Sequence, residues 1–118
     1  MKSKYLDNQQ EQFKDKIIII TGSTQGSGAE TARLFAARGA KAITICGRQQ
    51  NKGNKVKEEI ESFGTKCMYV NADLAKIDDC KKIVSLTDKE FGTIHSLINV
   101  AGYTQRGTIL SATLENYE

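Results

Sequence analysis

The sequence predicts an α/β fold built on a doubly wound parallel sheet. The prediction rests on an unbroken apolar run at Ile17 to Ile20, a glycine-rich segment directly after it, and apolar runs that alternate with helical patterns further along. A short continuous apolar run is typical of a strand buried on both faces of a parallel sheet. Strands that alternate with helices imply right-handed crossovers, so we expect about four strands in the spatial order 3-2-1-4.

Each expected element follows from a local pattern of apolar residues, and glycines mark the ends of the helices. In chain order we expect a strand at Ile17 to Ile20, a helix at Gly28 to Arg38, a strand at Ala42 to Cys46, a helix near Lys52 to Ser62, a strand at Lys66 to Val70, a helix at Ile77 to Glu90, a strand at Ile94 to Val100 and a helix begun by Thr113. The third helix is expected to bury a stripe of Ile77, Cys80, Val84 and Phe91, widened by Ile83 and Leu86.

Composition excludes several classes of function. The 17 Lys and Arg and 14 Asp and Glu give a net charge of +3 without a basic cluster among aromatic residues, so no nucleic-acid partner is expected. No apolar stretch approaches the roughly 18 residues of a membrane span, and the amino terminus lacks an apolar leader. Cys46 and Cys67 lie in predicted strands without a C-x-x-C pair, which favours buried free thiols and a cytoplasmic protein.

The organisation of the chain is simple. Residues 1–14 are polar and are expected to form an arm, while residues 15–118 are expected to form one dinucleotide-binding domain that is incomplete at its carboxyl end. His95 is the only histidine of the sequence, which excludes a His-based metal cluster of ordinary type.

The segment Thr21-Gly-Ser-Thr-Gln-Gly-Ser-Gly28 predicts a nucleotide site, because it joins a buried strand to a helix. Free N–H groups and the dipole at the start of a helix favour phosphate. Gly22 lets the chain leave the strand, Gly26 allows close approach of a pyrophosphate, and Gly28 lets the helix pack close to the sheet. The candidate ligand-binding residues are Gly22, Ser23, Thr24, Gln25, Gly26, Ser27 and Gly28. A tight loop without a ligand is the alternative, and a P-loop is excluded because no Gly-Lys-Ser or Gly-Lys-Thr follows.

Three motifs together resemble the short-chain dehydrogenase/reductase family over about residues 13–118. They are Thr21-Gly-x-x-x-Gly26-x-Gly28, which is similar to the cofactor signature, Asp73-Leu74, and Asn99-Val-Ala-Gly102, which is similar to the Asn-Asn-Ala-Gly motif. The resemblance implies a Rossmann-type fold that binds NAD(P)(H) and transfers hydride between nicotinamide and a carbonyl or alcohol. Ser27 departs from the Ile or Leu that is usual in the family, which removes an apolar contact under the loop and implies lower affinity.

The resemblance also assigns roles to individual residues. It implies that Asp73 and Leu74 lie on the adenine side and that Ala101 and Gly102 leave room for the cofactor ribose. The alternative role of Asp73 is to form a turn after a strand. The alternative role of Asn99 is to join neighbouring strands through backbone hydrogen bonds.

Arg48 favours NADP(H) over NAD(H). It follows the second predicted strand, where NAD-specific members of the family usually carry an acid for the ribose 2′-hydroxyl, whereas an arginine can clamp a 2′-phosphate. A solvated arginine is the alternative. Gln25 weighs against NADP(H), because many NADP-preferring members carry a basic residue there.

The catalytic residues that the resemblance implies are a Ser and a Tyr-x-x-x-Lys motif. No tyrosine of this sequence is followed four positions later by a lysine. That position holds Gln after Tyr5, Asp after Tyr69 and Gly after Tyr103, and Tyr117 has only one residue after it. We therefore expect this chain alone to be inactive, with its catalytic residues beyond residue 118, and a homo-oligomer only for a complete family member. A non-catalytic dinucleotide-binding module and a truncated product are the alternative interpretations.

Overall fold

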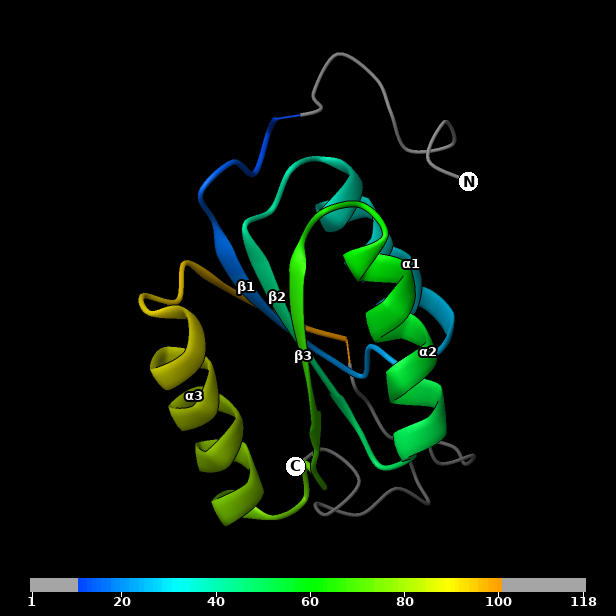
Figure 1. The fold of residues 1–118 in the computed structure, drawn as a ribbon. Coiled ribbons are helices and arrows are strands. Elements are labelled where there is room, and N and C mark those ends of the chain that lie inside the picture. Colours follow the sequence, from blue (N-terminus) through cyan, green and yellow to red (C-terminus); the bar gives the residue numbers. More distant parts are fainter. Residues whose placement is uncertain (1–10, 101–118) are drawn as a thin grey trace, which may run out of the picture.

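Four parallel strands form the centre of this computed structural model, which describes residues 11–100 (Figure 1). The elements are β1 (Ile17–Thr21), α1 (Gly26–Ala37), β2 (Ala42–Gly47), α2 (Gln50–Glu61), β3 (Lys66–Asn71), α3 (Ile77–Phe91) and β4 (Ser96–Asn99). The strands lie in the order β3-β2-β1-β4, which confirms the predicted fold class and the predicted strand order. The helix expected from Thr113 lies outside the described residues.

The two faces of the sheet are buried by different helices. Side chains alternate between the faces of a strand, so Ile18 and Ile20 face one way and Ile19 faces the other. Helices α1 and α2 cover the first face, and α3 covers the second (Figure 1). The first face is packed mainly with small residues of α1 and with Val56 and Ile60 of α2. This arrangement explains why both faces of β1 are apolar.

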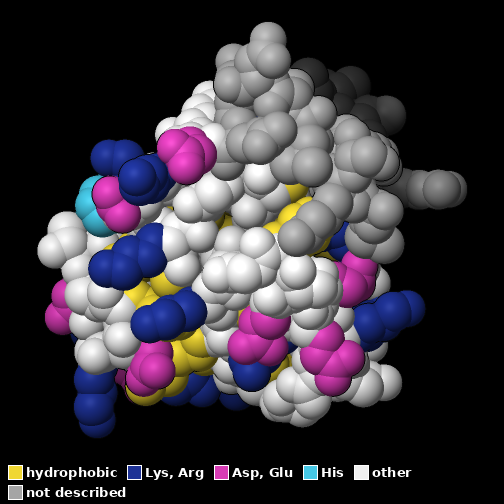
Figure 2. All heavy atoms as spheres, turned by 45° about the horizontal axis from the view of Figure 1, so that its top comes forward, with side chains coloured by type: hydrophobic (Ala, Val, Ile, Leu, Met, Phe, Trp, Pro, Cys, Tyr) yellow, Lys and Arg dark blue, Asp and Glu magenta, His cyan; other side chains and the backbone are white. Residues whose placement is uncertain are grey.

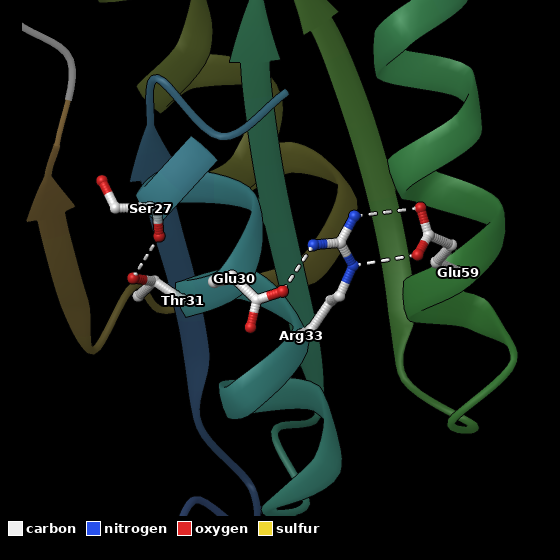
Figure 3. Close-up of polar contacts among 5 residues, drawn as sticks. All are labelled: Ser27, Glu30, Thr31, Arg33 and Glu59. Carbon is white, nitrogen blue, oxygen red and sulfur yellow. Dashed lines mark hydrogen bonds and ion pairs between the residues drawn. The ribbon is translucent and has the colours of Figure 1, made fainter. Parts of the chain in front are cut away.

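Arg33 joins the two helices of the first face. Its guanidinium donates to Glu59 of α2 through Nε at 2.9 Å and Nη2 at 3.1 Å, and through Nη1 to Glu30 at 3.1 Å (Figure 3). Both Arg33 and Glu59 are half-buried, and two parallel hydrogen bonds fix the geometry of such a pair. The contact holds α2 against α1, whose first turn forms part of the candidate site.

The stripe predicted for α3 is wrong in part. Ile77 is 73% exposed and Val84 is 49% exposed, against the prediction. Ile83 is buried as predicted, and Thr87 is buried although it was not predicted. Thr87 is accommodated in the core because its hydroxyl donates to the carbonyl of Ile83 at 2.7 Å and lies 2.8 Å from the Thr44 hydroxyl. A pattern of apolar residues alone does not identify a buried threonine, so the buried side of α3 is shifted from the predicted one toward Ile83 and Thr87.

β4 begins later than the predicted strand because His95 interrupts the backbone ladder at that end. The N–H of Ile17 donates to Nδ1 of the His95 ring at 3.0 Å, while the N–H of His95 donates to the carbonyl of Ile17 at 2.9 Å. A side chain thus replaces the carbonyl that a longer strand would supply. Regular pairing of β4 with β1 begins one residue later, between Ser96 and Ile18.

The described part of the predicted arm, residues 11–14, contacts the domain. The ring centroids of Phe13 and Phe35 lie 4.4 Å apart, and the N–H of Phe13 donates to the carbonyl of Arg38 at 2.9 Å. Lys14 forms an isolated antiparallel bridge with Ala40. These contacts cover the end of α1 that lies away from the glycine turn, while the division of the chain near residue 14 stays a prediction.

Candidate nucleotide-binding site

The candidate site lies where the sheet changes its direction of winding. β2 and β4 flank β1 on opposite sides, and all three strands run parallel, so their carboxyl ends meet at one edge. Ligands of open α/β sheets bind outside this edge, at the point where the strand order reverses. The glycine turn from Gly22 to Gln25 leaves β1 at that point and leads directly into α1.

Gly28 seats the first turn of α1 on the backbone of the glycine turn. A Cβ atom placed on Gly28 would lie 1.9 Å from the carbonyl oxygen of Gly22 and 2.7 Å from its carbonyl carbon. Gly22 itself has φ of 64°, in the left-handed region that favours glycine. The close approach that Gly28 permits is therefore to the turn, in addition to the predicted packing of the helix near the sheet.

The amino terminus of α1 has amide donors without a partner among residues 11–100. Gln25 is its N-cap in an extended conformation, yet no side chain in that range caps the helix, and its first turn carries no acidic residue. The first N–H groups of a helix have no partner within the helix, and its dipole favours an anion there. A Cβ placed on Gly26 would meet nothing within 4 Å among the described atoms, so none of them fills the space beside Gly26. This arrangement can accept a phosphate group.

Ser23 and Thr24 fasten the turn to the end of β2. The Ser23 side chain is fully buried, where its hydroxyl donates to the carbonyl of Ile20 at 2.6 Å and accepts from the N–H of Cys46 at 3.1 Å. Thr24 contacts Gly47, where an added Cβ would lie 2.8 Å from the Thr24 methyl carbon. The hydroxyl of Ser23 is thus committed to the strands, and any contact of Ser23 with a ligand would come from its backbone.

Tyr69 of β3 supports the end of β2, a role that the sequence reasoning missed. Its hydroxyl donates to the carbonyl of Gly47 at 2.9 Å, and desolvation by burial raises the pKa of Tyr69. Gly53 of α2 makes room for the ring, because a Cβ there would lie 2.2 Å from it. The signal in the sequence was Gly53 itself, since a glycine inside a helix costs stability and indicates close packing.

Arg48 follows Gly47 at this edge and is exposed. Among residues 11–100, no hydrogen bond or ion pair engages its guanidinium. No acidic side chain occupies the two positions on either side of it, which are Cys46, Gly47, Gln49 and Gln50. An arginine of this kind is available to bind an anion near the end of β2.

Asp73 forms a turn after β3, which is the alternative that the sequence left open. Its carboxylate accepts from the N–H of Ala75 at 3.0 Å, and its own N–H donates to the carboxylate of Asp79 at 2.7 Å. Leu74 is half-buried against the apolar cluster under α3. These contacts fix the position of Asp73 near the carboxyl edge without testing its predicted role beside an adenine.

Asn99 ties β4 to β1, because it stands opposite Thr21 in the parallel ladder and its side chain adds a second contact between the two strands. Its Oδ1 accepts from the Thr21 hydroxyl at 2.7 Å, and the same hydroxyl accepts from the N–H of Val100 at 3.1 Å. Sequence reasoning named Thr21 only as the start of a motif and missed this partnership. Ala101 and Gly102, the other residues predicted to line the ribose, lie outside the described residues.

Other chemistry near the site is limited. Burial raises the pKa of the Cys46 thiol more strongly than a backbone hydrogen bond with Gly22 lowers it, so this thiol is not an activated nucleophile. Over residues 11–100 no cluster of three metal-binding side chains occurs, and no helix of that range is long and apolar enough to cross a membrane.

The opposite edge of the sheet carries charges of both signs. In Figure 2 the amino-terminal ends of the strands come forward, and Lys and Arg side chains are interspersed there with Asp and Glu.

Comparison with known proteins points to one family. Residues 16–118 match the short chain dehydrogenase family. An uncharacterized oxidoreductase of Thermotoga maritima is 35% identical over 106 residues, which are 90% of this chain and 41% of that protein. The 11-beta-hydroxysteroid dehydrogenase 1A of Arabidopsis thaliana is 36% identical over 96 residues, covering 80% of this chain and 27% of that protein.

Solved structures give the same picture. The L-sorbose reductase of Gluconobacter frateurii, solved in complex with NADPH and L-sorbose, superposes with a TM-score of 0.80 at 29% identity. The match covers 92% of this chain and 41% of the reductase. The chain therefore spans about two fifths of the length of this reductase and of the Thermotoga protein.

Proposed function

The chain belongs to the short-chain dehydrogenase family, and on this premise we propose that it forms the NADP(H)-binding part of an oxidoreductase. The complete enzyme would transfer hydride between the nicotinamide and a carbonyl or alcohol substrate. Proteins of this family bind NAD(P), so the proposal concerns which dinucleotide is bound and by which residues of this chain.

One observation carries the proposal, namely the uncapped amino terminus of α1 seated on the turn after β1. The contact between Gly28 and Gly22 places the first amides of α1 beside the turn, and no described atom lies within 4 Å of a Cβ built on Gly26. This cradle fits the pyrophosphate of a dinucleotide. We assign Gly22, Ser23, Thr24, Gln25, Gly26, Ser27 and Gly28 to it.

The remaining assignments follow the edge of the sheet. Arg48 would bind the 2′-phosphate, since its guanidinium is exposed at the end of β2 with no acid beside it. We place Asp73 and Leu74 on the adenine side, and Asn99, Ala101 and Gly102 along the ribose and nicotinamide side. The NADPH bound by the L-sorbose reductase is consistent with this choice of cofactor.

The bound cofactor would supply the hydride chemistry, while the described residues bind it and fix its orientation. The sequence has no Tyr-x-x-x-Lys motif, so we propose that the 118-residue chain binds NADP(H) without turning over a carbonyl substrate. From its composition we also place it in the cytoplasm, without a nucleic-acid partner.

Arg48→Asp tests the cofactor assignment. We expect it to weaken NADPH binding by about 1.5 to 3 kcal/mol, the range for a hydrogen bond to a charged group, and to change NADH binding much less. Titration calorimetry of the 118-residue chain with each nucleotide measures both values. Lys41→Asp is the matched control, because it makes the same charge change at the exposed, opposite end of β2.

Two outcomes would contradict the proposal. Equal losses for NADPH and NADH in Arg48→Asp would remove Arg48 from the 2′-phosphate. Failure of the folded wild-type chain to bind either nucleotide, with folding checked by circular dichroism, would reject the cradle at α1.

A further inference from the structure

Lys52 of α2 reaches across to the glycine turn. Its Nζ donates a hydrogen bond of 2.7 Å to Oε1 of Gln25, a residue 27 positions earlier in the chain. Gln25 is the N-cap of α1, directly before the amides that the cradle uses. The ammonium group is therefore held beside the turn, although Lys52 itself is an exposed residue in the first turn of its helix.

The turn and the start of α2 are fixed relative to one another by other contacts. Ser23 bonds to the N–H of Cys46, and Thr24 packs against Gly47, so the turn is attached to the end of β2. Gly47 is in turn held by the Tyr69 hydroxyl, and Arg48 follows it. Arg48 and Lys52 thus both follow the end of β2, whose backbone is held by these contacts.

The charge of Lys52 is not neutralised by its partner. The oxygen of Gln25 belongs to a neutral amide, and an ammonium group has three donors, of which this contact uses one. Among residues 11–100 no carboxylate forms an ion pair with Lys52, whereas Lys57 of the same helix lies 3.8 Å from Glu61. A cation with free donors, placed by a neutral group, is suited to bind a second anion.

We propose that Lys52, positioned by Gln25, is a second specificity-determining residue for the 2′-phosphate of NADP(H), alongside Arg48. The inference rests on the proposed function of the site. It also accounts for Gln25, which the sequence reasoning counted against NADP(H) because it is not basic. The positive charge that this position lacks is delivered by Lys52 from α2.

Lys52→Gln tests the inference in the 118-residue chain, with NADPH and NADH titrated separately. We expect about a tenfold loss of NADPH affinity and less than about a twofold change for NADH, which lacks the 2′-phosphate. Lys55→Gln is the control, because it removes the same charge from an exposed position of the same helix that makes no hydrogen bond to the turn among residues 11–100, and both affinities should stay unchanged. Thermal unfolding of each variant confirms that the fold is retained.

A second variant distinguishes a lost charge from a disturbed helix. In the double variant Gln25→Arg, Lys52→Gln, the guanidinium supplies a cation at the turn itself, and we expect most of the preference for NADPH to return. Absence of this rescue would indicate that Lys52 acts through the structure of α2, and would overturn the inference.

The remaining outcomes separate this inference from the proposed function. If Lys52→Gln leaves NADPH affinity unchanged while Arg48→Asp lowers it selectively, the inference about Lys52 is rejected and the NADP(H) site stands. Equal loss of NADPH and NADH affinity in Lys52→Gln would also reject it. Binding of neither nucleotide by the wild-type chain would reject the site and the inference together.

Discussion

The two faces of the sheet differ in how completely they are covered. Under α1 and α2, eleven buried residues form one apolar cluster that includes Ile18, Ile20 and Ile60. Under α3 the corresponding cluster has five buried residues, and Val84 and Leu97 on that side of the described chain are 49% and 60% exposed. The first face is covered by a well-buried apolar core, whereas the second leaves large apolar side chains in contact with solvent.

The comparison shows which face supports the candidate site. The glycine turn, the start of α1 and Lys52 all belong to the well-covered face, where Arg33 and Glu59 also join α1 to α2. A binding site requires groups held by rigid packing, so most of its support should come from this side. Substitutions under α1 and α2 should therefore affect stability and cofactor binding more than substitutions on α3.

Gly28→Ala should have the largest effect. The added methyl group would overlap the Gly22 carbonyl, so we expect a loss of about 4 kcal/mol or more in the free energy of unfolding, above the usual range for overpacking. Chemical denaturation measures the loss, and NADPH binding should disappear with it. Gly64→Ala is the control, because a Cβ at Gly64 meets nothing within 4 Å and only its φ of 91° causes strain.

Ile60→Ala and Val84→Ala compare the two faces directly. Ile60 is fully buried under α2, so its truncation should cost about 3 kcal/mol, whereas Val84 is half-exposed on α3 and should cost less than about 0.5 kcal/mol. Denaturant unfolding of both variants gives the two values. Similar losses would mean that the face under α3 is as well packed as the other, and would remove the contrast.

Thr87→Val should have a smaller effect than Gly28→Ala or Ile60→Ala, and it tests the packing of the second face. It leaves the buried Thr44 hydroxyl without its partner, which should cost about 1 to 2 kcal/mol. The double variant Thr44→Val, Thr87→Val removes both hydroxyls and should recover part of that loss, as measured by thermal or denaturant unfolding. A double variant less stable than the single one would show that the two hydroxyls do not act as a pair.

Much of the fold was predictable from local patterns. The isoleucines of β1, the alternation of strands with helices and the glycines at helix ends are signals carried by neighbouring residues, and the strand order followed from them. The burial of Thr87 on α3 was not predictable in this way. A threonine is buried only when its hydroxyl finds a partner, and Thr87 finds Thr44, which is 43 residues away.

The candidate site was predictable in its location but not in its supports. Its glycines and Arg48 are recognisable by their order along the chain, while the contacts of Ser23 with Cys46, Tyr69 with Gly47 and Lys52 with Gln25 each join different elements. The two partners of each contact are too far apart along the chain for a local sequence pattern to reveal them. The role of Lys52 in particular depends on how α2 packs beside the turn.

The sequence by itself determined that a buried strand leads through a glycine turn into a helix, because apolar runs and glycines restrict the local backbone. It also determined membership of a dinucleotide-binding family, through motifs that keep their order along the chain. Only the tertiary structure decided which face of α3 is buried, that Asn99 pairs with Thr21, and that Lys52 lies beside Gln25. These depend on contacts between residues far apart in the chain, which form only when the sheet brings its elements together.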